Sequence, residues 1–184
     1  MTHGSGYGGT IKLLLLDVDG VLTDGTLFIG SAGEAYKGFN VRDGLAVALL
    51  RAHGLKTGIL SGKSSPALDF RITQLGIDLA ITGRIDKREA LAEILQEAAL
   101  TADAIAYVGD DVVDLPLVGQ VGRFYAPADA HPLVKQSADY VLATAGGRGA
   151  AREAAEHILD SAGLSLEQAY APLVGQWGEH RAIQ

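Results

Sequence analysis

Two aspartates separated by one residue, Asp17 and Asp19, directly follow four consecutive leucines. Such an apolar run predicts a strand that is buried on both faces of a sheet. Open α/β sheets bind ligands at the carboxyl ends of their strands, so both carboxylates are expected at a ligand-binding edge. A carboxylate can attack a phosphoryl group when a divalent cation offsets the repulsion between the two anions. The pair therefore indicates phosphoryl transfer, although two aspartates at a strand end can also simply cap a turn.

Further side chains that this chemistry needs come after other predicted strands. Ser61 ends a short apolar run and offers a hydroxyl group to a phosphoryl oxygen, and Lys87 stands at a predicted helix start and supplies a positive charge. A fourth segment contains Asp110, Asp111 and Asp114. Singly, these residues could be a turn serine, a solvated lysine and an acidic helix cap favoured by the helix dipole. Their common position after strands favours one shared site.

The residue types predict a separate role for each of these side chains. Asp17 is expected to be the nucleophile and a metal ligand. Asp19 is expected to act as general acid and then general base, with its backbone carbonyl on the metal. Ser61 and Lys87 would bind the transferred phosphoryl group, and the acidic segment 109–114 would complete the metal site. Mg²⁺ is the expected cation, because it prefers carboxylate, carbonyl and water oxygens and keeps positions open for a substrate.

Strand and helix patterns alternate along the chain. This alternation predicts an α/β fold with a doubly wound, mainly parallel, Rossmann-like sheet. Asp43 is the expected N-cap of the first helix, and Gly76 is expected to end the second. After the opening strand, the expected strands are 56–60, 77–81, 104–108, 123–125 and 140–142, and the expected helices are 45–53, 66–75, 87–100, one near 133, and 150–161.

One domain is expected, because 184 residues are too few for two ordinary domains. It should span residues 11–162, with a β-hairpin at 26–39. The glycine-rich segment 1–10 is interpreted as a flexible leader. The segment 163–184 is interpreted as a C-terminal tail with some apolar residues but no clean helical period.

Composition narrows the classes of partner. The formal net charge is −7 and no basic stripe is present, which argues against nucleic acid. No apolar run approaches the ~18 residues of a membrane-spanning helix, so no membrane partner is expected. The chain has no cysteine, which excludes disulfides and thiolate metal sites and suits a cytoplasmic protein.

The order and spacing of these segments resemble the four motifs of the haloacid dehalogenase superfamily. The resemblance implies that Asp17 becomes phosphorylated, that Asp110 is the metal ligand of the acidic segment, and that Asp111 and Asp114 hold or tune the site. Larger members of the superfamily insert a cap domain after the first strand. The hairpin 26–39 occupies that position and is too short to be a cap.

A narrower resemblance, over about residues 12–159, is to the capless phosphatases that act on 3-deoxy-manno-octulosonate 8-phosphate (KDO 8-phosphate). It is carried by segments 39–44, 107–111, 128–132 and 145–150. It implies a role in lipopolysaccharide biosynthesis and a homotetramer in which the hairpins build the assembly and neighbouring subunits cover each site. The segment expected to contact substrate is Asn40-Val41-Arg42-Asp43-Gly44.

Two departures from this family concern the sugar acid. Ala48 stands where the family typically has an arginine, and Lys63 replaces the arginine of a Thr-Gly-Arg sequence. A lysine offers a point charge and lacks the bidentate fork of an arginine. Arg71 still matches, so Arg42, Lys63 and Arg71 are the cations expected to meet the sugar carboxylate. Related capless phosphatases of nine-carbon, sialic-type sugar acids are the nearest alternative substrate class.

Two non-catalytic classes compete with the enzyme interpretation. A phospho-receiver domain would share the sheet, the acceptor aspartate, a hydroxyl group and a lysine. An inactive homologue of the phosphatases is the other possibility, but the sequence retains every expected catalytic group. A Mg²⁺-dependent assay with a generic aryl phosphate would separate these classes, because only the enzyme turns over.

Overall fold

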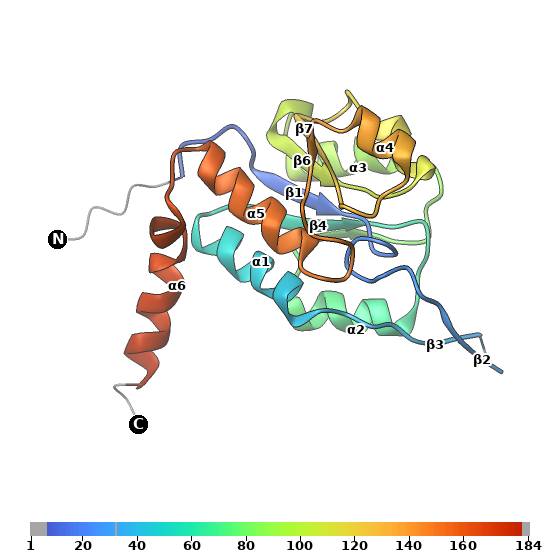
Figure 1. Cartoon of the computed structure of the whole chain (residues 1–184), viewed down its shortest axis with the longest axis horizontal. Helices are drawn as coiled ribbons and strands as arrows, with labels where there is room; N and C mark the ends of the chain where they lie inside the picture. Colours follow the sequence, from blue (N-terminus) through green and yellow to red (C-terminus); the bar gives the residue numbers. More distant parts are fainter. Residues whose placement is uncertain (1–6, 32, 182–184) are drawn as a thin grey trace.

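The computed structural model describes residues 7–31 and 33–181, so the leader residues 1–6 and residues 182–184 of the tail lie outside the described part. A six-stranded sheet forms the centre of the molecule, with strand order β5-β4-β1-β6-β7-β8 (Figure 1). Every pairing in this sheet is parallel, which confirms the predicted doubly wound α/β fold. The strands are β1 (Leu13–Leu16), β4 (Lys56–Leu60), β5 (Leu79–Ile81), β6 (Ile105–Val108), β7 (Arg123–Ala126) and β8 (Tyr140–Val141).

Helices cover both faces of this sheet. On one face lie α1 (Val41–Ala52), α2 (Pro66–Leu75), α5 (Ala150–Ser161) and α6 (Leu166–Arg181). On the other face lie α3 (Lys87–Ala98), α4 (Pro132–Ser137) and the 3₁₀ helix η2 (Val112–Leu117), and a further 3₁₀ turn, η1 (Ala102–Ala104), precedes β6. Among the described residues, no helix combines the length and the apolar character needed to cross a membrane.

The leucines of β1 divide between two apolar cores. Leu14 and Leu16 pack into the core under α1 and α5, whereas Leu13 and Leu15 pack into the core under α3. Successive side chains of a strand point to opposite faces, so a strand in the middle of the sheet needs apolar residues at every position. This requirement explains the unbroken leucine run and fixes Asp17 at the carboxyl end of the central strand.

The first helix begins earlier than the sequence predicted. Asn40, not Asp43, is the N-cap of α1, and its Oδ1 accepts a hydrogen bond from the backbone N–H of Arg42 at 2.9 Å. Asp43 lies in the first turn, where its Oδ1 accepts a hydrogen bond from Ala151 N at 2.9 Å. It thereby caps α5, whose own N-cap residue, Gly149, has no side chain.

The segment after Gly163 is more regular than predicted, because it forms the helix α6. Ala169 and Leu173 of this helix are buried against the core beneath α1 and α5. Tyr170 adds polar contacts, since its hydroxyl donates to Glu156 at 2.6 Å and accepts from Arg152 Nε at 2.9 Å. The helix contains Pro172, which is uncommon inside a helix, so neither an apolar period nor the local sequence predicted it.

The predicted hairpin is present as the antiparallel pair β2 (Phe28–Gly30) and β3 (Gly33–Tyr36). It projects from the body of the molecule at the end opposite to α6 (Figure 1). The chain then returns directly to α1, so the hairpin is the only insertion at this point among the described residues. The structure therefore agrees with the expectation that no cap domain follows β1.

Candidate active site

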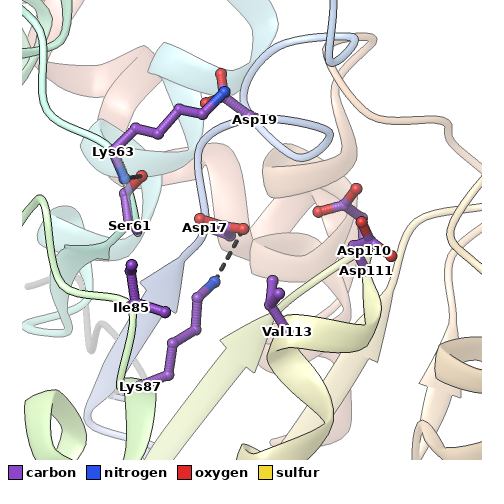
Figure 2. Close-up of a pocket in the computed structure, with 10 residues that line it drawn as sticks. Asp17, Asp19, Ser61, Lys63, Ile85, Lys87, Asp110, Asp111 and Val113 are labelled. Carbon is purple, nitrogen blue, oxygen red and sulfur yellow. Dashed lines mark hydrogen bonds and ion pairs between the residues drawn. The ribbon is translucent and has the colours of Figure 1, made fainter.

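A cleft of about 450 Å³ opens at the carboxyl ends of β1, β4 and β6 (Figure 2). Parallel strands place their carboxyl ends at one edge, so residues that are distant in sequence meet there. The cleft is lined by Asp17, Asp19, Ser61, Gly62, Lys63, Ile85, Lys87, Asp110, Asp111 and Val113. The structure thus brings together every residue that was predicted to be catalytic or to bind metal.

A buried ion pair lies at the floor of this cleft. Lys87 Nζ is 2.9 Å from Asp17 Oδ2, and 3% of Lys87 is exposed. Burial lowers the pKa of Lys87, but the charges of Asp17 and Asp114 more than offset this and leave it raised. Burial raises the pKa of Asp17 to about 6, and the charge of Lys87 opposes this rise. Lys87 therefore stays protonated and favours the nucleophilic, ionised form of Asp17.

Asp114 is completely buried and holds the surrounding groups in place. Its Oδ2 accepts hydrogen bonds from the backbone N–H groups of Asp110 and Asp111 at 2.9 and 3.2 Å. Its Oδ1 accepts from the Tyr107 hydroxyl at 2.5 Å and also pairs with Lys87. Because both oxygens are engaged, Asp114 is suited to fixing the acidic loop and the lysine rather than to binding a metal.

Asp110 carries the clearest signature of a cation site. Its Oδ1 is buried and has no hydrogen-bond partner among the described residues. Oxygens of Asp17, Asp110 and Asp114 lie within 4.8 Å of one another. Burial raises the pKa of Asp110 to about 8, and the charges of Asp17 and Asp114 add to the rise. A divalent cation would relieve both the desolvation and the repulsion, and carboxylate oxygens suit Mg²⁺.

The turn after β1 must approach Asp110 closely. A side chain at Gly20 would place its Cβ 2.0 Å from Asp110 Oδ2, and the φ of Gly20 is +88°. Both facts require glycine there. The Asp-Gly sequence at 19–20 thus has a structural reason, because it lets the two acidic segments approach each other.

Asp19 lies at the rim of the cleft and is paired with a residue that the sequence analysis missed. Lys37 Nζ lies 2.5 Å from Asp19 Oδ1 and 2.9 Å from Glu34 Oε1. Lys37 stands between β3 and α1, where no periodic pattern distinguishes it from a solvated lysine. Only the Glu34–Lys37 spacing within an otherwise apolar hairpin could have drawn attention to it.

The cations predicted to meet the sugar acid are divided between two hollows. Lys63 lines the cleft, and its side chain extends across the mouth toward Asp19 (Figure 2). Arg42 and Arg71 line a second hollow of about 400 Å³ beside α1 and α2. The structure therefore places Lys63, but not Arg42 or Arg71, in the lining of the cleft that contains Asp17 and Asp110.

The rest of the segment predicted to bind substrate serves the local structure. Asn40 caps α1 and donates from Nδ2 to Gly147 O at 3.1 Å, and Asp43 is 2% exposed beneath α5. Val41 and Gly44 line the second hollow beside Arg42. A Cβ at Gly44 would lie 3.0 Å from both Arg71 Nη2 and Leu75 Cδ2, so the glycine lets α1 and α2 approach. Segment 40–44 therefore joins α1, α2 and α5.

The sequence of this chain is similar to a known family of hydrolases. The family model of haloacid dehalogenase-like hydrolases matches residues 77–153. A protein of Haemophilus influenzae named 3-deoxy-D-manno-octulosonate 8-phosphate phosphatase is 46% identical over 155 residues, which are 84% of this chain and 86% of that protein.

Two solved structures are also similar. A cobalt-bound form of the Haemophilus influenzae phosphatase superposes with a TM-score of 0.83 at 43% identity, covering 88% of this chain and 97% of that one. The Moraxella catarrhalis phosphatase, in complex with a magnesium ion, a phosphate ion and a KDO molecule, has a TM-score of 0.79 at 36% identity. That match covers 83% of this chain and 87% of the other.

Proposed function

Because this chain belongs to the family of 3-deoxy-D-manno-octulosonate 8-phosphate phosphatases, within the haloacid dehalogenase-like hydrolases, we propose that it hydrolyses KDO 8-phosphate to KDO and phosphate. The observation that carries the proposal is the 46% identity to a phosphatase of that name over most of both chains. The buried Asp17–Lys87 pair beside Asp110 supplies the groups that such a reaction needs.

In the proposed mechanism, Asp17 attacks the phosphorus atom and forms a phospho-aspartate. Lys87 holds the Asp17 carboxylate in its ionised form and at a fixed orientation through the 2.9 Å ion pair. Ser61 directly follows β4 and lines the same cleft. Its hydroxyl group donates a hydrogen bond to a phosphoryl oxygen. These contacts stabilise charge that spreads over the phosphoryl oxygens in the transition state.

Asp19 is proposed to move protons. It donates a proton to the departing sugar oxygen and then takes one from the water that hydrolyses the phospho-aspartate. Its position suits both steps, because its side chain is 22% exposed and lines the cleft together with Asp17. A carboxylate deeper in the cleft could not reach water as easily.

Mg²⁺ is the metal we assign to this site, with Asp17, Asp110 and the backbone carbonyl of Asp19 as ligands from the chain. The buried Oδ1 of Asp110, which has no partner among the described residues, fits a hard cation. Bound Mg²⁺ would neutralise charge on the phosphoryl oxygens and on the nucleophile. The phosphatase of Moraxella catarrhalis was solved with magnesium, phosphate and KDO together, which supports this choice.

Recognition of the sugar end is proposed to depend on Lys63 within the cleft of one subunit. The roles predicted for segment 40–44 and for Arg71 stay predictions. Their second hollow could serve the substrate of a neighbouring subunit if the chain assembles. The nine-carbon alternative is not proposed, because the relatives compared above are named for the eight-carbon acid.

Assembly and location also stay predictions. A homo-oligomer, and specifically a tetramer built by the hairpins, is supported by the exposed apolar side chains of Leu27, Phe28, Ile29 and Tyr36. A solvated ribbon rarely carries such a patch. The expected cytoplasmic location rests on composition alone.

The test of this function is a phosphate-release assay on the purified chain with Mg²⁺. The substrates are KDO 8-phosphate, a nine-carbon sugar-acid 9-phosphate and p-nitrophenyl phosphate. We expect kcat/KM to be highest for KDO 8-phosphate. A preference for the nine-carbon ester would contradict the substrate assignment, and lack of turnover on all three would support an inactive or receiver-like domain.

A further inference from the structure

Lys37 places a charge from the base of the hairpin against Asp19, which lines the catalytic cleft. It lies between β3 and α1, and its Nζ sits between two carboxylates, 2.5 Å from Asp19 Oδ1 and 2.9 Å from Glu34 Oε1. Its side chain is 1% exposed.

The net stability gained from such a pair does not explain why it is buried. Removing two charges from water costs about as much as their attraction returns, so apolar residues of similar size would stabilise the fold at least as well. In some proteins, such ion pairs instead fix the positions of their members. We therefore expect the contact to affect the orientation of Asp19 more than the stability of the fold.

Among the described residues, the only other hydrogen bond of the Asp19 carboxylate is weak, although Lys63 also extends toward it (Figure 2). The Thr23 hydroxyl lies 3.5 Å from the same Oδ1, at the limit of a hydrogen bond. Lys37 contacts Oδ1 from the base of the hairpin, and Asp19 itself lines the cleft. We propose that Lys37 is a positioning residue that orients the Asp19 carboxylate toward the leaving oxygen of the substrate. This inference rests on the proposed function, in which Asp19 is the general acid.

The proposal predicts a loss of rate that depends on the leaving group. A sugar alkoxide needs a proton to depart, whereas nitrophenolate departs without one. Correctly placed acid catalysis contributes roughly 10²–10⁴-fold, so partial misplacement should cost about tenfold or more. In Lys37→Met we expect that loss in kcat/KM for alkyl phosphates and a change within about twofold for p-nitrophenyl phosphate.

Three substrates separate this role from others. KDO 8-phosphate has an alkoxide leaving group and a carboxylate, glycerol 3-phosphate has the alkoxide alone, and p-nitrophenyl phosphate has neither. Loss on both alkyl esters with the aryl ester spared is the expected result. Loss on KDO 8-phosphate alone would mean that Lys37 binds the sugar carboxylate, and would overturn the proposal. Equal losses on all three, or no loss, would overturn it too.

Three further variants complete the design. Lys56→Met removes the same charge from an exposed position on β4 and should leave all three rates unchanged. If Lys37→Met does not fold, Lys37→Ser decides by the same criteria, since it removes the contact with Asp19 without leaving an apolar group between the carboxylates. In the Asp19→Asn background, Lys37→Met should cost nothing more on the alkyl esters. An additive loss there would overturn the proposal.

The controls also distinguish failure of this inference from failure of the proposed function. If the wild-type chain turns over glycerol 3-phosphate but not KDO 8-phosphate, the substrate assignment fails. The comparison of the alkyl with the aryl ester then still tests Lys37. If the wild-type chain prefers KDO 8-phosphate but Lys37→Met loses nothing, only the role of Lys37 fails.

Discussion

At the scale of single residues, the cleft brings together more carboxylates than its one buried lysine can neutralise. Asp17, Asp110 and Asp114 bring their oxygens within 4.8 Å, and Lys87 supplies one buried positive charge against them. The pKa of Asp110 rises to about 8 as a result of burial and of these neighbours. The arrangement is therefore suited to receive a cation, and its chemistry depends on that cation and on Asp17.

Asp17→Asn should abolish turnover on every phosphate ester and leave the fold intact. An amide is neither a comparable nucleophile nor an anionic ligand, and it keeps nearly the same shape in its buried position. Phosphate release should fall by at least about a thousandfold, and circular dichroism should not change. Asp69→Asn, which changes an exposed aspartate of α2, is the matched control. Retention of more than a few per cent of wild-type activity would contradict the covalent mechanism.

Removal of the metal should inactivate the enzyme reversibly. EDTA should abolish phosphate release, and added Mg²⁺ should restore it, because carboxylate and carbonyl oxygens are the donors at this site. Ca²⁺ should compete with Mg²⁺ but support little turnover, because its larger and looser coordination shell would misplace nucleophile and phosphate. Titrating Ca²⁺ into the Mg²⁺ enzyme measures both effects. Undiminished activity in chelator would remove the metal from the mechanism.

The sequence predicted the residues that line the cleft better than the residues that hold them. Asp17, Ser61 and Asp110 could be found because each follows a strand whose apolar pattern is legible. Lys37 could not be found, because its contact with Asp19 depends on how the hairpin folds back. Asp43 was assigned to its own helix, since nothing local shows that it reaches α5.

At the scale of elements, short-range signals located most boundaries. β4, α2 and α5 begin and end as predicted, because prolines, glycines and apolar periods mark them. The tail was harder to interpret, since α6 is held by packing of Ala169 and Leu173 rather than by a strong helical period. Tertiary contacts decided where local preference was weak.

The junction of α1 and α5 depends on one buried carboxylate and offers a test through pH. Burial raises the pKa of Asp43 to about 6, from 3.8. The folded state therefore binds this proton more tightly than the unfolded chain. The stabilising effect of that proton is complete below about pH 4 and is lost as pH rises to about 6.

Asp43→Asn removes this dependence while keeping an oxygen that can accept from Ala151 N. The variant should therefore gain stability relative to wild type as pH rises from about 4 to about 6, and the difference should level off above about pH 7. Urea unfolding at several pH values measures it. Asp43→Ala, which also removes the cap, should be less stable than Asp43→Asn by about 1 kcal/mol at every pH. Parallel pH profiles for wild type and Asp43→Asn would contradict the raised pKa.

At the scale of the whole molecule, the hairpin and the helix α6 mark opposite ends (Figure 1). The hairpin leaves four large apolar side chains exposed, with Ile29 at 67% and Tyr36 at 74%. A two-stranded ribbon is at best marginally stable in water on its own. The same ribbon carries Glu34 and Lys37, whose contact with Asp19 connects it to the cleft. Assembly through the hairpin would therefore act on catalysis as well as on solubility.

We expect the wild-type chain to be an oligomer and the double substitution Phe28→Glu and Ile29→Lys to make it monomeric. It places charges where we expect a subunit interface, and light scattering after gel filtration measures the mass. The monomer should lose at least about tenfold in kcat/KM on KDO 8-phosphate, because an uncovered cleft admits water and because the hairpin no longer fixes Lys37. Phe70→Glu, on a 70% exposed phenylalanine of α2, is the control that should change neither mass nor rate. A wild-type chain that is monomeric and fully active would show that the hairpin is a local support for Asp19 and not an interface.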